Sequence, residues 1–207
     1  MAQPGVKEAM QLLQQAKELV VVQKKEWGEI LTELERRNKY RVFGADGQEM
    51  LRAQEVGGSF LTRLLLRSWR PFRMALSTPD DRTMLQLYRP FRFYFTEIQV
   101  ADVTGRALGR VQRRFSFLRR IYSVFDATGR EICQLYGPLL HPWTFEVRQD
   151  GRTLGRIGKR WGGILREGFT EADTFGISFP AGFDATTKAI LLGATFLIDF
   201  AHFESSR

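Results

Sequence analysis

Residues 189–198 read AILLGATFLI, and this run decides the fold that the sequence predicts. It is apolar on every face of a helix, and Lys188 and Asp199 bound it. A helix needs about 20 apolar residues to cross a bilayer, so this one is too short. A short helix that is hydrophobic all round is expected to be buried in protein. We therefore predict a buried central helix over 185–203, with a membrane span as the alternative. Its core residues are Ile190, Leu191, Ala194, Phe196, Leu197, Ile198 and Asp199.

The chain before this helix repeats one local pattern. An apolar run, a turn containing Asp and ending in Gly, and a second apolar run occur at 42–51, 100–111, 124–135 and 147–157. Gly supplies the positive φ, and Asp bonds nearby backbone, as hairpin turns require. The pattern predicts a mainly β protein, an antiparallel meander. Closing the meander into a barrel would remove its exposed edges and enclose the apolar helix.

The N-terminal part differs from the rest. Residues 1–17 are polar with spaced apolar positions, which predicts a short amphipathic helix. Residues 19–23 read LVVVQ and predict the first strand. We find no linker, so residues 18–207 are expected to form one domain. No basic segment followed by an apolar run opens the chain, so we expect no secretory signal and a cytoplasmic location.

Charge and composition narrow the function classes. The net charge of +8 and the pI of about 10.0 favour anionic partners: phospholipid, nucleic acid or an acidic protein. The two histidines argue against a His-rich metal site. The sequence contains no catalytic triad pattern, Walker loop or dinucleotide fingerprint, so we expect that the protein is not an enzyme. Cys133, the single cysteine, excludes an internal disulfide and is predicted to be unreactive.

The C-terminal third carries a family resemblance. Residues 155–180 read GRIGKRWGGILREGFTEADTFGISFP, and FLIDF follows at 196–200. Matching segments also lie upstream, at 38–40, 47–48, 70–72 and 89–90. Over about residues 19–204 the chain resembles the phospholipid scramblases, within the tubby-like and LURP-one-related superfamily.

The resemblance implies a tubby-like fold, a twelve-stranded antiparallel β-barrel enclosing a hydrophobic C-terminal α-helix. It also implies calcium-triggered movement of phospholipids between leaflets, with low headgroup selectivity, on the cytosolic face of a membrane. The alternative is a soluble tubby-like adaptor that binds anionic phospholipids. Nucleic-acid binding is a further alternative that rests on charge alone. The sequence leaves the oligomeric state open.

The same resemblance places a calcium segment at 171–182, in which Glu171 and Asp173 are the candidate ligands. Asp184, just after the segment, could serve as a further ligand only in a shifted geometry. The chain departs from the family at Glu171 and at Gly182, where scramblases typically have Asp. A weak Ca²⁺ site that needs lipid oxygens is therefore expected. The competing interpretation is a strand, because Phe175, Ile177 and Phe179 alternate with other residues, which puts one face in the core. Asp184 is also a suitable helix N-cap.

Cations alternate with aromatic rings in several stretches, a mixture that suits both anionic headgroups and nucleic acid. The resemblance also implies a palmitoylated cysteine segment in some relatives, where this chain has FYF at 93–95. The alternative is ordinary strand alternation, with Phe115 and Phe117 pointing inward. Asp199 is interpreted as a structural acid or as part of a headgroup track. The candidate membrane-binding residues are Arg67, Trp69, Arg70, Arg73, Arg89, Arg92, Arg113, Arg114, Arg119, Arg120, Lys159 and Arg160.

Overall fold

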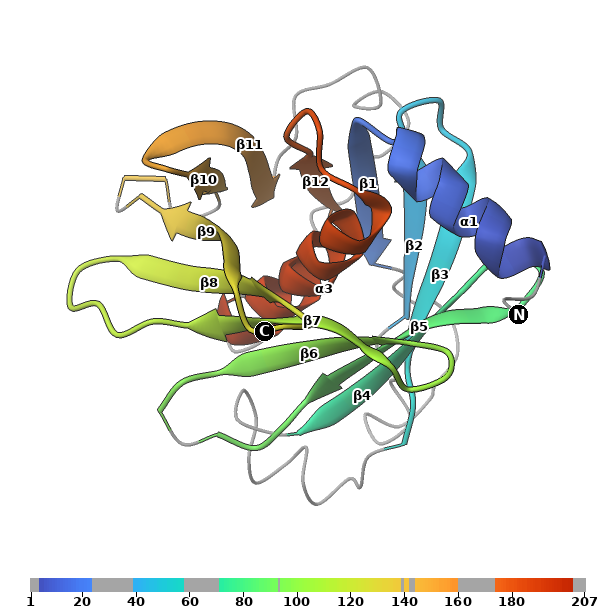
Figure 1. Cartoon of the computed structure of the whole chain (residues 1–207), viewed down its shortest axis with the longest axis horizontal. Helices are drawn as coiled ribbons and strands as arrows, with labels where there is room; N and C mark the ends of the chain where they lie inside the picture. Colours follow the sequence, from blue (N-terminus) through green and yellow to red (C-terminus); the bar gives the residue numbers. More distant parts are fainter. Residues whose placement is uncertain are drawn as a thin grey trace, which may run out of the picture.

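The computed structural model describes residues 4–23, 39–57, 71–92, 94–138, 140–141, 144–159 and 174–202. A long C-terminal helix runs through a wall of strands, and a short N-terminal helix lies outside it (Figure 1). The elements are α1 (Pro4–Gln15), β1 (Glu18–Gln23), β2 (Lys39–Gly44), β3 (Glu49–Glu55), β4 (Phe72–Ser77), β5 (Thr83–Arg89), β6 (Glu97–Asp102), β7 (Ala107–Arg113), β8 (Arg120–Asp126), β9 (Glu131–Gly137), β10 (Thr144–Gln149), β11 (Arg152–Lys159), β12 (Thr174–Ser178) and α3 (Ala185–His202).

The twelve strands form a closed antiparallel barrel, which confirms the predicted fold class. Each strand pairs with its neighbours in sequence, and β1 closes the barrel against β12. Consecutive antiparallel strands alternate in direction, so their connections collect at two ends. We call the end with the connections β2–β3, β4–β5, β6–β7, β8–β9 and β10–β11 the turn end. The end with β5–β6, β7–β8 and β9–β10 is the loop end.

Two turns at the turn end share one construction. Gly105 and Gly129 have φ of 85° and 86°, a conformation that glycine adopts without steric cost. The Asp126 carboxylate accepts hydrogen bonds from the backbone of Thr128 at 2.9 Å and of Arg130 at 3.0 Å. Asp102 makes the equivalent bonds one hairpin earlier. The predicted Asp-Gly hairpins are therefore confirmed at these turns.

The helix α3 occupies the barrel interior, as predicted, and ends at His202 in the described chain. Its six predicted apolar core side chains are no more than 1% exposed, and Asp199 is 4% exposed. Asp184 caps its start, because Oδ1 accepts a hydrogen bond from the Thr187 backbone at 2.8 Å. Among the described residues, no helix is long and apolar enough to cross a membrane.

The barrel wall approaches α3 closely at Gly109 of β7. A Cβ atom there would lie 2.3 Å from the Phe125 carbonyl oxygen and 2.5 Å from Cδ1 of Ile190. A Cβ atom added at Gly193 of the helix would likewise lie 2.8 Å from Cγ2 of Val100. Wall and helix thus meet at positions that exclude a side chain.

The helix α1 packs across the start of α3 and buries Ala9 and Leu13. Lys188 Nζ donates hydrogen bonds to the carbonyls of Gln14 at 2.5 Å and Ala16 at 2.8 Å. The Gln14 side chain in turn accepts from the Ala185 backbone at 2.7 Å. These contacts satisfy carbonyls at the end of α1 and an amide at the start of α3. The division into 1–17 and 18–207 stays a prediction.

Candidate functional site

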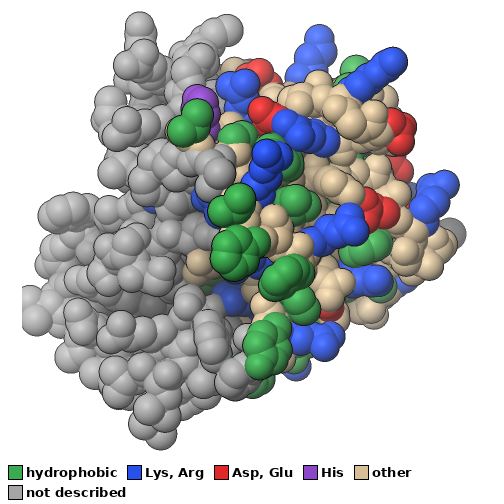
Figure 2. Space-filling model, turned by 90° about the vertical axis from the view of Figure 1, so that its left-hand side faces the viewer, with side chains coloured by type: hydrophobic (Ala, Val, Ile, Leu, Met, Phe, Trp, Pro, Cys, Tyr) green, Lys and Arg blue, Asp and Glu red, His purple; other side chains and the backbone are tan. Residues whose placement is uncertain are grey.

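The loop end exposes large apolar side chains. Exposed fractions reach 82% for Tyr94, 82% for Phe115 and 92% for Phe117. Figure 2 shows hydrophobic and Lys or Arg side chains interleaved on this face. The inward direction considered for Phe115 and Phe117 is wrong, because β7 ends at Arg113 and strand alternation ends with it. Among the described residues, the exposed large apolar side chains on these three connections are Phe91, Tyr94, Phe95, Phe115, Phe117, Leu118 and Leu140.

Two arginines of the predicted set face the barrel interior at this end. Arg113 continues the inward face of β7, two residues after Val111, which is fully buried. Arg120 lies on the inward face of β8, two residues before Tyr122. Its guanidinium stacks over the Phe145 ring at 4.7 Å and donates to the His141 carbonyl at 3.5 Å. Burial lowers the pKa of Arg120, and the charge of Arg113 adds to this effect.

The buried phenol of Tyr122 marks where these cations converge. Burial raises the pKa of Tyr122 to about 12, although the charges of Arg113, Arg120 and Arg89 oppose the rise. Arg113 pairs with Tyr122 across the β7–β8 ladder, and Arg120 precedes Tyr122 by two residues on β8. Arg89 ends β5 at the same end of the barrel. Concentrated positive charge at a partly water-excluded mouth favours an anionic ligand.

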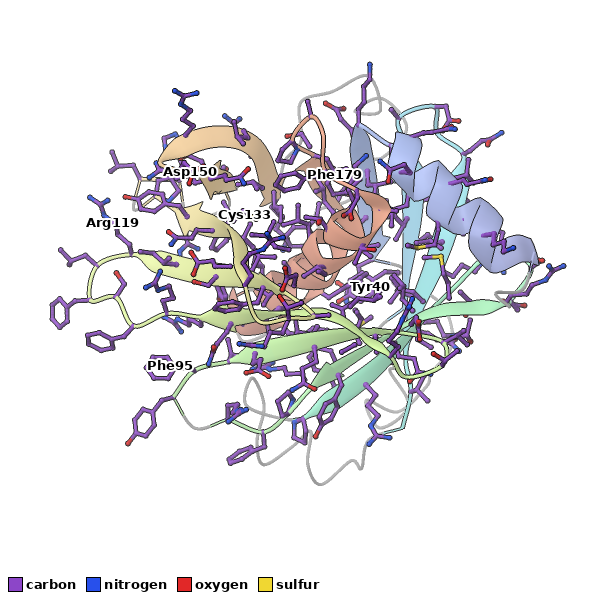
Figure 3. All side chains as sticks on the ribbon, viewed as in Figure 1. Tyr40, Phe95, Arg119, Cys133, Asp150 and Phe179 are labelled. Atoms are coloured by element: carbon purple, nitrogen blue, oxygen red, sulfur yellow. The ribbon has the colours of Figure 1, made fainter. Side chains whose placement is uncertain are left out.

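Other arginines stack on the outer surface. Arg148 and Arg119 both contact the Tyr136 ring, at 3.7 Å and 5.2 Å from guanidinium carbon to ring centroid. Arg119 also donates a hydrogen bond to the Tyr136 hydroxyl. Figure 3 places Arg119 and Phe95 on the same side of the molecule. Stacking orders these cations beside the exposed rings.

The remaining members of the predicted membrane-binding set are spread around the barrel. Arg73 stacks on Tyr88 and Lys159 on Phe175, at 5.4 Å and 5.5 Å. An ion pair joins the exposed Arg92 to the buried Glu97 at 3.6 Å, and a second, more exposed pair joins Arg114 to Glu131 at 3.8 Å. An exposed pair of such length contributes little to stability. Arg67, Trp69, Arg70 and Arg160 lie outside the described residues.

Arg89 differs from the sequence interpretation, which put it on the surface. It is 4% exposed, on the inward face of β5, and its guanidinium lies 5.7 Å from the Phe72 ring. Phe72 stacks on Phe200 of α3 at 4.1 Å. Arg89 therefore packs inside the barrel against a ring that contacts the central helix, away from the outer surface.

The described chain contains only one of the three predicted calcium ligands, Asp184, so the calcium site stays a prediction. Asp184 caps α3 at the turn end, whereas β12 begins with Thr174 at the opposite end. Phe175 and Ile177 are buried on one face of β12, which supports the strand interpretation. Glu171 and Asp173 lie outside the described residues. Within those residues, no cluster of three His, Cys, Asp or Glu side chains could hold a metal ion.

Two buried groups have structural surroundings. Asp199 of α3 accepts a hydrogen bond from the Tyr40 hydroxyl at 2.7 Å, and Tyr40 packs edge-on against Phe196. Cys133 is 3% exposed, and burial raises the pKa of its thiol to about 12, with the charge of Glu131 adding to the rise. A thiol with so high a pKa is a poor nucleophile at neutral pH.

Sequence reasoning missed the aromatic partners of the arginines. Tyr122 of β8 and Phe145 of β10 pack edge-on inside the barrel with ring centroids 5.8 Å apart, whereas Tyr136 of β9 lies on the outer face. The β8–β9 ladder pairs Tyr122 with Leu135, so these two side chains lie next to each other on the same face of the sheet. Alternation within each strand indicates which face a ring occupies, but not which cation it meets.

The fold and the loop end define a β-barrel around a central helix, with cations and exposed rings gathered at one mouth. The sequence profile of the family described as Scramblase matches residues 1–205. The chain belongs to the phospholipid scramblase family.

Named relatives agree with this assignment. The chain is 30% identical to phospholipid scramblase 1 of Homo sapiens over 211 residues, covering 95% of this chain and 66% of the relative. It is 31% identical to phospholipid scramblase 2 of Bos taurus over 212 residues, covering 96% and 72%. The chain thus spans slightly less than two thirds of the human scramblase 1.

A solved structure shares the fold at much lower identity. The X-ray structure of a protein from Arabidopsis thaliana superposes with a TM-score of 0.52 at 10% identity. The match covers 92% of this chain and 98% of that one. It supports the fold and carries no functional conclusion.

Proposed function

We propose that this protein moves phospholipids between the leaflets of a membrane, acting from the cytosolic face. The observation that carries the proposal is the match of the scramblase family over residues 1–205, together with relatives named phospholipid scramblases. Such transport makes and breaks no covalent bond, so it requires a path for the headgroup and no catalytic side chain.

The loop end supports the proposal with suitable chemistry. A phospholipid presents an anionic phosphate beside apolar chains, and a protein that handles it needs cations next to apolar surface. Arg113 and Arg120 supply cations at the barrel mouth, and Phe115 and Phe117 supply apolar surface on the adjoining loop. We propose anionic phospholipids as the preferred partners, because the net charge is +8.

The decisive experiment measures leaflet exchange of a fluorescent phospholipid in vesicles that contain the pure protein. We expect faster loss of fluorescence to an external quencher than in protein-free vesicles. The assay is run with Ca²⁺ and with chelator, because a calcium requirement stays a prediction. Exchange that remains at the protein-free rate in both conditions would contradict intrinsic scrambling.

A lipid-binding adaptor is the second candidate, and the buried position of α3 favours it. All six apolar members of the predicted helix set point into the barrel and are no more than 1% exposed. An adaptor would float with anionic vesicles in a salt-sensitive way, without lipid exchange. Equal binding to duplex DNA and to vesicles of matched charge would instead favour a general polyanion binder.

A further inference from the structure

We propose that the protein docks on the bilayer with the loop end of the barrel, inserting the tips of the β5–β6 and β7–β8 connections. The tip residues are Tyr94, Phe95, Phe115, Phe117 and Leu118. This inference deepens the proposed function and rests on it for the choice of a membrane as partner.

The two ends of the barrel differ in exposed apolar surface. Seven of the twelve exposed large apolar side chains among the described residues lie on three loop-end connections. The turn-end connections expose one, Val103, at 42%. Their other residues are polar or are Gly, Ala or Pro, and the carboxylates of Asp102 and Asp126 accept local hydrogen bonds in two of these turns. Concentration of exposed apolar surface at one end marks an interaction surface.

The β7–β8 connection has cations on both sides of its apolar tip. Residues 113–120 read RRFSFLRR, so two arginines precede and two follow the tip. The longer segment 103–125 contains six arginines and no acidic residue. Anionic headgroups complement this charge, and rings inserted below the phosphates would leave the guanidinium groups at phosphate depth. This arrangement favours a bilayer over an apolar protein groove.

The docking sets the orientation of the whole barrel. The C-terminal end of α3, with Asp199 and its partner Tyr40, would face the membrane. The turn end and α1 would face away, since α3 starts there against α1. The cationic mouth around Tyr122 would then lie close to the headgroups.

The orientation can be tested with single probes, because Cys133 is buried and its pKa is about 12. An environment-sensitive fluorophore is attached to Leu118→Cys at the loop end or to Ala127→Cys at the turn end. The two sites flank β8. On vesicles of phosphatidylcholine and phosphatidylserine, spin-labelled lipid should quench the probe at 118 and leave the probe at 127 unchanged. Quenching of the probe at 127 would refute the docking. Absence of quenching at both sites, in protein that floats with the vesicles, would refute it as well.

A second measurement examines the rings themselves. Phe115→Ser/Phe117→Ser should lower vesicle affinity at least about tenfold, because each inserted ring contributes through its buried apolar area. Val103→Ser is the matched control and should bind like the parent protein. Thermal unfolding should be unchanged in both, since all three side chains are exposed. Unchanged vesicle affinity of the double variant would overturn the proposal. So would a double variant that no longer dimerises but still binds vesicles like the parent protein.

The outcomes separate this inference from the proposed function. Quenching at 118 without lipid exchange would leave the docking correct and the transport wrong. Lipid exchange with the probe at 118 still in water would leave the transport correct and the docking wrong.

Discussion

Tyr40 of β2 donates a hydrogen bond of 2.7 Å to the Asp199 carboxylate of α3, inside the barrel. The two residues are 159 positions apart, and neither is more than 4% exposed. The bond joins the first part of the wall to the end of the central helix. A buried carboxylate requires such a donor, because its desolvation is otherwise costly.

Removing this donor should destabilise the fold. We expect Tyr40→Phe to lower the free energy of unfolding by about 1–3 kcal/mol, because a buried acceptor loses its partner. Urea denaturation followed by fluorescence measures the loss. The matched control is Tyr94→Phe, which removes a hydroxyl from a side chain that is 82% exposed. A Tyr40→Phe protein as stable as the parent would show that the bond contributes nothing.

A charge placed in the middle of α3 should prevent folding. Ala194 is fully buried, so Ala194→Arg would place a guanidinium without a partner in the barrel core. The expected cost is at least several kcal/mol, comparable to the whole stability of a domain. Circular dichroism and thermal melts check this, with Ala127→Arg at an exposed turn as the control. A cooperative melt close to the parent temperature would contradict burial of the helix.

The thiol of Cys133 should be unreactive in the folded protein. Its pKa is raised to about 12, so the thiolate fraction at pH 8 is very small, and the side chain is also shielded from reagents. We expect a disulfide reagent to modify no thiol in native protein at pH 8 and one thiol in urea. Rapid modification under native conditions would mean that the barrel opens at β9.

The turn aspartates should make stability depend on pH at the acid end. Hydrogen bonding by Thr104 lowers the pKa of Asp102, and that by Thr128 lowers the pKa of Asp126, in both cases against a smaller effect of burial. A lowered folded pKa stabilises the protein above the ordinary aspartate pKa, and the contribution is lost as the pH falls through the lowered value.

The difference in stability between the parent and Asp102→Asn/Asp126→Asn should therefore shrink as the pH drops below about 4. Denaturation at a series of pH values measures it. A difference that stays constant down to pH 2 would exclude the charged carboxylates as its source.

The arginines at the barrel mouth should govern affinity for anionic lipid. Each cation near an anionic surface contributes about 1 kcal/mol, so Arg113→Gln/Arg120→Gln should weaken binding to phosphatidylserine vesicles by about tenfold or more. Arg110→Gln is the control, because Arg110 lies on the outer face of β7 against Phe125. Sedimentation with vesicles at two salt concentrations measures the affinity of both variants. Equal weakening by the control would point to net charge alone.

The sequence predicted well wherever local chemistry decides the outcome. Asp-Gly turns recur because the φ of Gly129 and the bonds of Asp126 are local requirements. The helix after Asp184 was predictable because an all-apolar run too short for a bilayer must be enclosed by protein. The calcium ligands stay a prediction, since Glu171 and Asp173 lie outside the described residues.

What the sequence by itself determined is therefore the family, the hairpin repeat and the buried central helix. Only the tertiary structure decided which way the candidate site residues face. Arg89 lies inside and Phe117 outside because a side chain follows strand alternation only within the strand, and β7 ends before Phe117. The convergence of Arg113 and Arg120 on Tyr122 depends on register and barrel closure, which set distances between residues that no local pattern relates.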